Sequence, residues 1–370
     1  MKIKKINLLN FRNYSNSSIS FHDKLTILVG NNAQGKTNIV EGISILALTK
    51  SFRVGNNLNL IKYGKSKCRI KGIIKKESII TKLEVDLSET EKKLMVNQSN
   101  ISKVSDYISN LNVILFTPDD LEIIKGSPNI RRNLLNMELS QISKKYLKIY
   151  NEYHRLLKTR NEYLKVLFQN SIADKAYLDI ITDKLIEKAI FIYKLRKEYI
   201  DNINKNIDNY YKNIFGDSGL VIKYTPNIEF DSFEDEVMRK KMKHTFKKNY
   251  LKELNYGMTI YGPHRDDFIF SFKERDLKIS GSQGQQRLAI ICFKLSEITI
   301  FKDHSNYYPV LLLDDIFSEL YIKKRNKLLK MITEHDVQCI ITTTDLKNIS
   351  KSYIEKSLVY YVKDGTVERK

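Results

Sequence analysis

The sequence predicts an α/β fold in which a helical segment interrupts one domain, and three observations support this prediction. Short β-branched runs bounded by turns lie near both ends of the chain. A long stretch between them contains neither glycine nor proline, and its apolar residues recur at spacings of three and four. Neither end alone carries a complete set of site motifs, so one interrupted domain explains the pattern better than three independent domains.

Length and composition indicate a globular protein. The 370 residues suffice for one large domain or two smaller ones, and 42% of them are hydrophobic. The chain has no run of 18 apolar residues, and its basic N-terminus lacks the features of a secretory signal. We therefore expect a cytoplasmic protein that does not bind membranes. The three cysteines lie far apart among apolar neighbours, which predicts buried thiols at Cys68, Cys292 and Cys339.

The charge balance favours a polyanionic partner. Sixty-three Lys and Arg residues against 43 Asp and Glu residues give a formal net charge of +20. A protein this basic attracts nucleic acid at long range. The alternative is a bias of composition, because Lys, Asn and Ile are abundant throughout the chain. On charge alone both explanations remain open.

The strands are predicted before and after the helical stretch. They are residues 2–11, 24–30, 67–76, 79–87 and 112–117, and then 267–272, 310–315 and 337–344. Between Pro128 and Gly216, two apolar stripes separated by the polar residues 169–175 predict an antiparallel helical hairpin. The pattern of these stripes fits both an extended helical arm and a compact helical lobe. The predicted division is 1–125 and 255–370 for the two parts of the α/β domain, with 126–254 for the helical part.

The first candidate site is a phosphate-binding loop. Gly30, Gly35, Lys36 and Thr37 fit the pattern G-x-x-x-x-G-K-[ST], between an apolar strand and a helical pattern. Such a loop turns its backbone N–H groups toward phosphates at a helix N-terminus. We expect Lys36 to reach the β- and γ-phosphates of ATP and Thr37 to bind Mg²⁺. The intervening loop residues are Asn31, Asn32, Ala33 and Gln34.

The second candidate site is a pair of aspartates after an apolar run. Residues 310–313 predict a buried strand that ends at Asp314 and Asp315. We expect Asp314 to hold Mg²⁺ and Asp315 to orient or deprotonate the attacking water. Taken alone, the pair fits a helix cap equally well, but the phosphate loop in the same chain favours the metal site.

The polar segment SQGQQR at residues 282–287 leads directly into an apolar stretch. With the motifs around it, it resembles the ABC-type ATPases of the structural-maintenance group, and most closely the RecF family of bacterial recombination-repair proteins. The similar segments are NFRNY, GNNAQGKTNIVEGI, KSFR, FTPDDLEIIKGSPNIRRNLLN, YGPHRDDF, SQGQQR and LLLDDIFSEL, and they cover nearly the whole chain. The resemblance implies a P-loop ABC-type ATPase head with an inserted helical lobe or short antiparallel helical arm.

The resemblance also implies how the polar segment acts. In such ATPases it closes over ATP bound to the phosphate loop of a second subunit, which makes ATP part of a homodimer interface. Ser282, Gly284 and Gln285 are then expected to contact the γ-phosphate, with Thr343 or Thr344 as a sensor of that phosphate. The alternative for Ser282 is a simple helix N-cap, which affects stability but not association.

Two positions depart from the family pattern. Tyr321 stands where the family carries an aspartate in the loop that crosses the interface, which puts cooperativity between the two sites in doubt. Asn136 stands where aspartate is more common, and we assign it no catalytic role.

The segment GPHRDD resembles a metal cluster, with His264, Arg265, Asp266 and Asp267 in succession. Because neighbouring residues of a strand point to opposite sides, we favour a structural or interface role over a second metal. For Arg131 and Arg132 we favour a salt-bridged structural role.

By resemblance, the function is that of an ATP-dependent DNA-binding protein of replication and recombinational repair. The resemblance implies a dimer that binds ATP and closes around duplex DNA near single-strand to double-strand junctions. It also implies weak DNA-dependent ATP hydrolysis. The implied partners are RecR and RecO, which act with the protein in loading the recombinase on gapped DNA. Two alternatives remain open. One is a nucleotide-gated DNA-binding module with little hydrolysis, and the other is a chromosome-organising ATPase.

Overall fold

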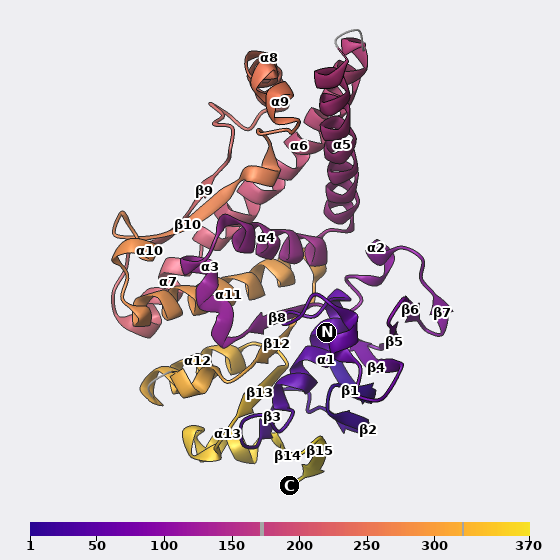
Figure 1. Cartoon of the computed structure of the whole chain (residues 1–370). Coiled ribbons are helices and arrows are strands. Elements are labelled where there is room, and N and C mark those ends of the chain that lie inside the picture. Colours follow the sequence, from indigo (N-terminus) through magenta and orange to yellow (C-terminus); the bar gives the residue numbers. More distant parts are fainter. Residues whose placement is uncertain (171–173, 320–321) are drawn as a thin grey trace. The chain divides into compact units, whose positions relative to one another are not determined.

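The computed structural model describes residues 1–170, 174–319 and 322–370 (Figure 1). The chain divides into two compact units. Unit 1 comprises Met1–Asp120, Asn209–Asp217 and Ile290–Lys370, and unit 2 comprises Leu121–Asp208 and Ser218–Ala289. Unit 1 therefore combines both ends of the chain, as the interrupted-domain prediction requires.

The centre of unit 1 is a mainly parallel six-stranded sheet with buried strands. Its order is β15 (Thr366–Arg369), β14 (Leu358–Lys363), β3 (Leu25–Val29), β13 (Cys339–Thr343), β12 (Val310–Leu313) and β8 (Val113–Phe116). All pairings are parallel except that of β15 with β14. Every residue of β3, β8, β12 and β13 is buried, as expected for parallel strands covered on both faces.

A second, antiparallel sheet of unit 1 packs on the helix that follows the phosphate loop. Its order is β2 (Tyr14–Ser20), β1 (Lys2–Phe11), β4 (Lys67–Lys76), β5 (Ile79–Ser88), β6 (Lys92–Val96) and β7 (Ser99–Asn100). The helix α1 (Lys36–Leu48) contacts β1, β4 and β5. This contact holds the N-terminal end of α1 beside the central sheet.

The remaining helices of unit 1 flank these two sheets. They are η1 (Asn57–Leu60), α2 (Val104–Tyr107), η2 (Pro118–Leu121), η4 (Ile316–Glu319), α12 (Ile322–Glu334), η5 (Leu346–Asn348) and α13 (Lys351–Glu355). Two further helices, α7 (Ile207–Phe215) and α11 (Gln283–Ser305), contribute residues to both units, as does η2, whose last residue belongs to unit 2.

Unit 2 is mainly helical. Its helices are α3 (Glu122–Lys125), α4 (Pro128–Ile142), α5 (Lys144–Gln169), α6 (Lys175–Asn204), α8 (Asp235–Lys248), α9 (Tyr250–Tyr256), η3 (Pro263–Arg265) and α10 (Leu277–Ser280). A three-stranded antiparallel sheet contains β11 (Arg275–Asp276), β10 (Asp267–Phe272) and β9 (Leu220–Thr225). The pair α5 and α6 pack together over much of their length (Figure 1).

The sequence-based expectations for the fold agree with these elements. Two long helices lie on either side of the polar gap, and most of the residues in their stripes are buried. Side-chain caps begin both helices, because Ser143 Oγ accepts from the backbone N of Tyr146 and Asp174 Oδ1 accepts from that of Ala176. The three-part division into residues 1–125, 126–254 and 255–370 stays a prediction.

Two further expectations concern the whole chain. The three cysteines are buried thiols, as predicted. Among the helices in the described ranges, none is long and apolar enough to span a bilayer.

Candidate nucleotide site

The phosphate loop lies in unit 1 between β3 and α1. Gly35 adopts a φ of +115°, and a Cβ there would lie 2.7 Å from Asn13 Nδ2. A Cβ on Gly30 would lie 2.2 Å from the carbonyl oxygen of Val362. Backbone conformation and close packing therefore both require glycine in this loop.

The loop residues between these glycines differ in exposure. The side chains of Asn31, Asn32 and Ala33 are exposed, and Gln34 is half-buried. Gln34 Oε1 accepts from the backbone N of Asp364 at 2.7 Å. The loop is thus anchored to the turn between β14 and β15 at one residue and open to solvent at the other three.

Lys36 begins α1 and folds back over the loop. Its Nζ donates to the carbonyl oxygens of Gly30 at 2.5 Å and Asn31 at 2.7 Å. Burial lowers the pKa of this ammonium, while the nearby Asp315 and Asp314 carboxylates act in the opposite direction. The charge of Lys36 is therefore held inside the concave face of the loop.

Asp314 connects the phosphate loop to the central sheet. Its Oδ1 accepts from Thr37 Oγ1 at 3.0 Å and from Thr342 Oγ1 at 2.7 Å. Burial raises the pKa of this carboxyl above its ordinary value, and the two threonine hydrogen bonds oppose that rise. A hydroxyl and a carboxylate at hydrogen-bonding distance supply the oxygen donors that Mg²⁺ prefers, so these residues fit a magnesium site.

Asp315 follows directly and has an unusual backbone. Its φ is +50°, a conformation that aspartate tolerates better than most residues, and its backbone N donates to Thr342 Oγ1 at 2.9 Å. The Thr342 hydroxyl therefore contacts both aspartates at once. Sequence analysis did not identify Thr342 as a site residue.

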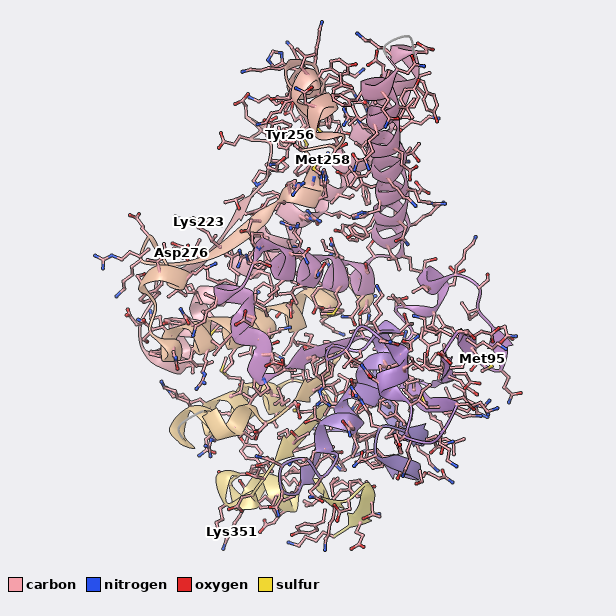
Figure 2. All side chains as sticks on the ribbon, in the orientation of Figure 1. Met95, Lys223, Tyr256, Met258, Asp276 and Lys351 are labelled. Atoms are coloured by element: carbon pink, nitrogen blue, oxygen red, sulfur yellow. The ribbon has the colours of Figure 1, made fainter. Side chains whose placement is uncertain are left out.

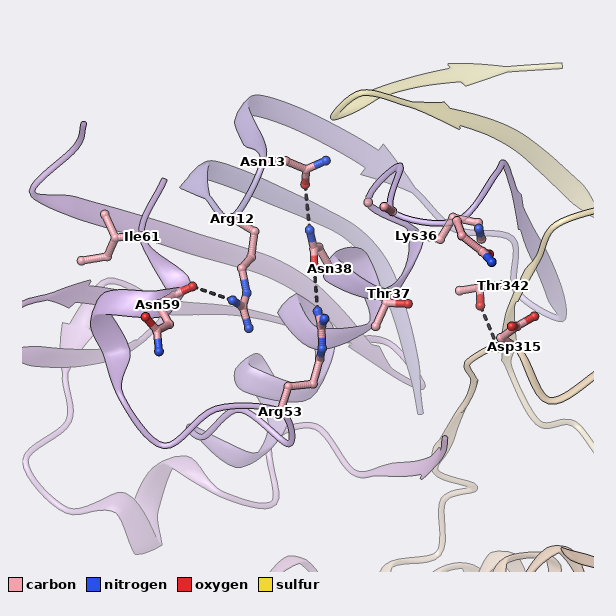
Figure 3. Close-up of a pocket in the computed structure, with 13 residues that line it drawn as sticks. Arg12, Asn13, Lys36, Thr37, Asn38, Arg53, Asn59, Ile61, Asp315 and Thr342 are labelled. Carbon is pink, nitrogen blue, oxygen red and sulfur yellow. Dashed lines mark hydrogen bonds between the residues drawn. The ribbon is translucent and has the colours of Figure 1, made fainter. Parts of the chain in front are cut away.

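A cavity of about 640 Å³ joins these residues (Figure 3). Lys36, Thr37, Asp315 and Thr342 line one part of it, and a second part is lined by residues that sequence analysis did not assign to the site. These are Arg12, Asn13, Asn38, Arg53, Asn59 and Ile61.

The second part of the cavity is built around a buried carboxylate. Glu41 is fully buried and accepts from Arg12 Nε and NH2 at 2.8 and 2.7 Å. Ser51 Oγ also donates to Glu41, at 2.6 Å, and an Arg53 guanidinium nitrogen lies 3.7 Å from it. Arg53 donates to Asn38 Oδ1 at 2.9 Å. Both arginines belong to segments quoted for the family resemblance, and that was the signal that could have identified them.

The polar segment begins α11 with a reciprocal cap. Ser282 Oγ accepts from the backbone N of Gln285 at 3.3 Å, and Gln285 Oε1 accepts from the backbone N of Ser282 at 2.9 Å. Ser282 and Gly284 are exposed, and Gln285 is half-buried. The cap foreseen as the alternative is present, and the contact with ATP of a second subunit stays a prediction.

The predicted γ-phosphate sensors occupy different environments. Thr343 is buried, and its hydroxyl donates to the carbonyl oxygen of Asp345 at 2.9 Å. Thr344 is exposed. The sensor role stays a prediction for both. Tyr321, whose effect on cooperativity we questioned, lies outside the described residues.

The GPHRDD segment forms a structural network within unit 2. Asp266 is fully buried and accepts from Arg196 NH1 at 2.9 Å, from the backbone N of Asn227 at 2.9 Å and from the Tyr224 hydroxyl. Asp267 instead accepts from Arg131 Nε and NH2 at 2.6 and 2.8 Å. The two aspartates thus face different partners, as strand geometry predicts.

The neighbours of these aspartates have structural partners as well. Arg132 donates to the carbonyl oxygen of Asp266 at 2.8 Å, and His264 pairs with the Tyr153 hydroxyl at 2.6 Å. Burial lowers the pKa of His264 to about 4. Among the described residues, no group of three His, Cys, Asp or Glu side chains could hold a metal ion. These contacts favour the structural role over a second metal.

Comparison with known proteins places the chain in a family. The family described as RecF/RecN/SMC N terminal domain matches residues 2–368. The DNA replication and repair protein RecF of Pediococcus pentosaceus is 38% identical over 369 residues, covering 99% of this chain and 98% of that protein. The chain belongs to the RecF family. RecF of Halalkalibacterium halodurans is likewise 38% identical and covers 100% of both chains.

Solved RecF structures have the same fold. The recombination mediator protein RecF with ATP, of the RecFOR pathway, superposes with a TM-score of 0.91 at 29% identity and covers 100% of this chain and 97% of that one. An Smc head domain bound to the winged-helix domain of ScpA superposes with a TM-score of 0.57 at 14% identity, covering 100% and 98%. The predicted ABC-type ATPase head with a helical insertion is confirmed.

Proposed function

We propose that this chain is an ATP-dependent DNA-binding protein of replication and recombinational repair, in which ATP and Mg²⁺ bind at the phosphate loop. The observation that supports it most directly is the Asp314 cluster. Thr37 of the loop and Thr342 of the sheet converge on one buried carboxylate, beside a cavity that Lys36 and Asp315 also line. The RecF structure with ATP supports the choice of nucleotide.

Each residue has a distinct task in this proposal. The loop amides and the N-terminal end of α1 bind phosphate oxygens, and the Lys36 ammonium neutralises charge between the β- and γ-phosphates. Thr37 and Asp314 hold Mg²⁺, which supplies charge neutralisation when bound. Asp315 orients the attacking water or accepts its proton during hydrolysis to ADP and phosphate. The buried Glu41 carboxylate fixes the half-buried Arg12 guanidinium on the wall of the same cavity.

A homodimer completes the site in this proposal. The exposed start of α11, with Ser282, Gly284 and Gln285, covers the γ-phosphate bound to the loop of a second subunit. A helix N-terminus suits an anion because its first backbone N–H groups point outward and carry partial positive charge. ATP binding thus favours the dimer and hydrolysis releases it.

The proposed ligands of the dimer are duplex and single-stranded DNA, which it binds near the junctions between them. The proposed location is the cytoplasm. The net charge of +20 supports a mainly electrostatic, salt-sensitive affinity with little sequence preference. RecO and RecR are proposed partners in loading the recombinase, because similar RecF structures belong to the RecFOR pathway.

The dimer is tested by light scattering of the parent and of Ser282→Arg, with and without ATP and Mg²⁺, at several protein concentrations. We expect ATP to double the molecular mass of the parent but not that of the variant, because a long cationic side chain at residue 282 prevents the start of α11 from covering the γ-phosphate. Ser143→Arg is the matched control. It removes a serine cap of the same kind from the start of α5.

The outcomes separate the two roles of Ser282. A control that still dimerises on ATP shows that loss of a helix cap alone does not prevent association. If the parent binds ATP and stays monomeric, the dimeric lid is wrong and Ser282 serves only as a cap. If ATP doubles the mass of Ser282→Arg as well, the polar segment at residues 282–287 does not form the interface.

A further inference from the structure

The helix α8 in unit 2 has an unusual distribution of charge. The segment from Arg239 to Lys252 contains seven Lys and Arg residues and no Asp or Glu. By contrast, α6 carries acidic residues along its whole length, so its basic residues have local counter-charges. A uniform bias of composition toward lysine does not explain a segment without carboxylates.

The basic side chains of α8 share one face. The buried residues Met238, Met242 and Phe246 recur every four positions and attach the helix to unit 2. At 100° per residue, Lys240, Lys241, His244, Lys247 and Lys248 fall on the opposite side, and all five are exposed. The helix therefore presents an outward face, called the α8 basic face, that consists of these five residues.

The four lysines of this face have no acidic partners in the described ranges. The ion pairs that α8 does make involve other residues: Lys243 with Asp183 at 2.8 Å, and Asp235 with Lys194 at 2.6 Å. Lys247 also lines a hollow of about 560 Å³ together with Lys175 and Lys243, where Asp179 and Asp183 offset part of the positive charge. Unpaired ammonium groups on a rigid helix attract polyanions without first losing an internal salt bridge.

We propose that the α8 basic face binds the phosphate backbone of DNA, as a contact surface in unit 2 additional to the nucleotide site of unit 1. The assignment rests on the DNA-binding function proposed above. Lys240 and Lys248 lie eight residues apart, about 12 Å along the helix axis. That length matches about three to four phosphates of one DNA strand. Lysine binds phosphate as a point charge and does not read bases, so the contact is independent of sequence.

The test is fluorescence anisotropy of a labelled duplex across a series of salt concentrations, with ATP and Mg²⁺ present. The variant combines Lys240→Gln, Lys241→Gln, Lys247→Gln and Lys248→Gln, which keep helix-favouring side chains at exposed positions. The matched control combines Lys351→Gln, Lys356→Gln, Lys363→Gln and Lys370→Gln, which are exposed lysines of unit 1 (Lys351 is labelled in Figure 2). Each set removes four positive charges.

We expect the α8 variant to lose about tenfold or more in affinity, with a salt slope shallower by about 2 to 3, because each lost phosphate contact lowers the slope by about 0.9. The control keeps the parental slope, and both variants bind ATP like the parent. Equal losses in the two variants would mean that only net charge matters, and parental DNA binding by the α8 variant would equally overturn the assignment. A parent that does not bind DNA at all contradicts the proposed function itself.

Discussion

Replacing Thr342 with valine tests the link between the aspartate pair and the sheet. The side chain is fully buried, and its hydroxyl donates to Asp314 Oδ1 at 2.7 Å and accepts from the backbone N of Asp315 at 2.9 Å. Valine has nearly the same shape but makes neither contact. Asp314 keeps the hydrogen bond from Thr37, and the N–H of Asp315 loses its hydrogen bond to the Thr342 hydroxyl.

The expected cost follows from these two contacts. A hydrogen bond to a charged group contributes about 1.5 to 3 kcal/mol, and a buried N–H without an acceptor costs about 1 to 3 kcal/mol. Thr342→Val should therefore lower the free energy of unfolding by roughly 2.5 to 6 kcal/mol. The matched control is Thr26→Val, on the neighbouring region of the same sheet. Thr26 is fully buried, and its hydroxyl accepts from the backbone N of His22, an exposed residue. In Thr26→Val, water can accept from that N–H in place of the hydroxyl. The expected loss in unfolding free energy is therefore about 1 kcal/mol.

The assays are urea denaturation followed by circular dichroism and the pH dependence of ATP binding with Mg²⁺. The Thr342 hydrogen bond favours the ionised form of Asp314, so its loss should raise the pKa of that carboxyl further. The acid limb of the binding profile should then move to higher pH in Thr342→Val and remain in place in Thr26→Val. Equal stability losses in the two variants, together with an unmoved acid limb, would refute this account of the site.

Two further predictions concern the carboxylates of Asp314 and Asp267. Asp314→Asn should abolish Mg²⁺-dependent ATP binding yet unfold at a higher urea concentration at neutral pH. The pKa of Asp314 is higher in the folded protein than in the unfolded chain, where it is about 3.9. Ionisation of Asp314 therefore lowers the free energy of unfolding as pH rises from the unfolded pKa through the folded pKa. A difference in unfolding free energy between Asp314→Asn and the parent that stays constant down to acid pH would contradict this. Asp267→Asn should lower the free energy of unfolding by about 3 to 5 kcal/mol, because it leaves the buried Arg131 guanidinium without its counter-charge. A urea denaturation curve unchanged from that of the parent would show that the pair contributes nothing to stability.

Sequence predicted the parts of the site that are local. The strand before Asp314 is a continuous apolar run, the strand before Gly30 is apolar except for Thr26, and each ends directly at its functional residue. The helical hairpin was predictable because its stripes extend over many turns. In contrast, β2 has the sequence YSNSSIS, whose small polar residues do not favour a strand, and it forms by pairing with β1.

The remaining site residues depend on tertiary pairing. All five residues of β13 are buried, so no alternation of polar and apolar residues indicates which threonine faces the aspartates. Thr342 makes the contacts with Asp314 and Asp315, whereas the sequence singled out Thr343 or Thr344, as sensors of the γ-phosphate, and that role stays a prediction. Arg12 and Glu41 likewise are 29 residues apart and meet only when β1 packs on α1.

The strand order of the central sheet has a consequence for synthesis on the ribosome. The strand that leads into the phosphate loop, β3, pairs on one side with Cys339–Thr343 and on the other with Leu358–Tyr361. Both neighbours leave the ribosome more than 300 residues after β3, so this strand stays unpaired during most of translation. A product that terminates before Cys339 lacks both neighbours of β3 and also lacks Thr342, which lines the nucleotide pocket. The pocket can therefore be completed only after translation has passed β13.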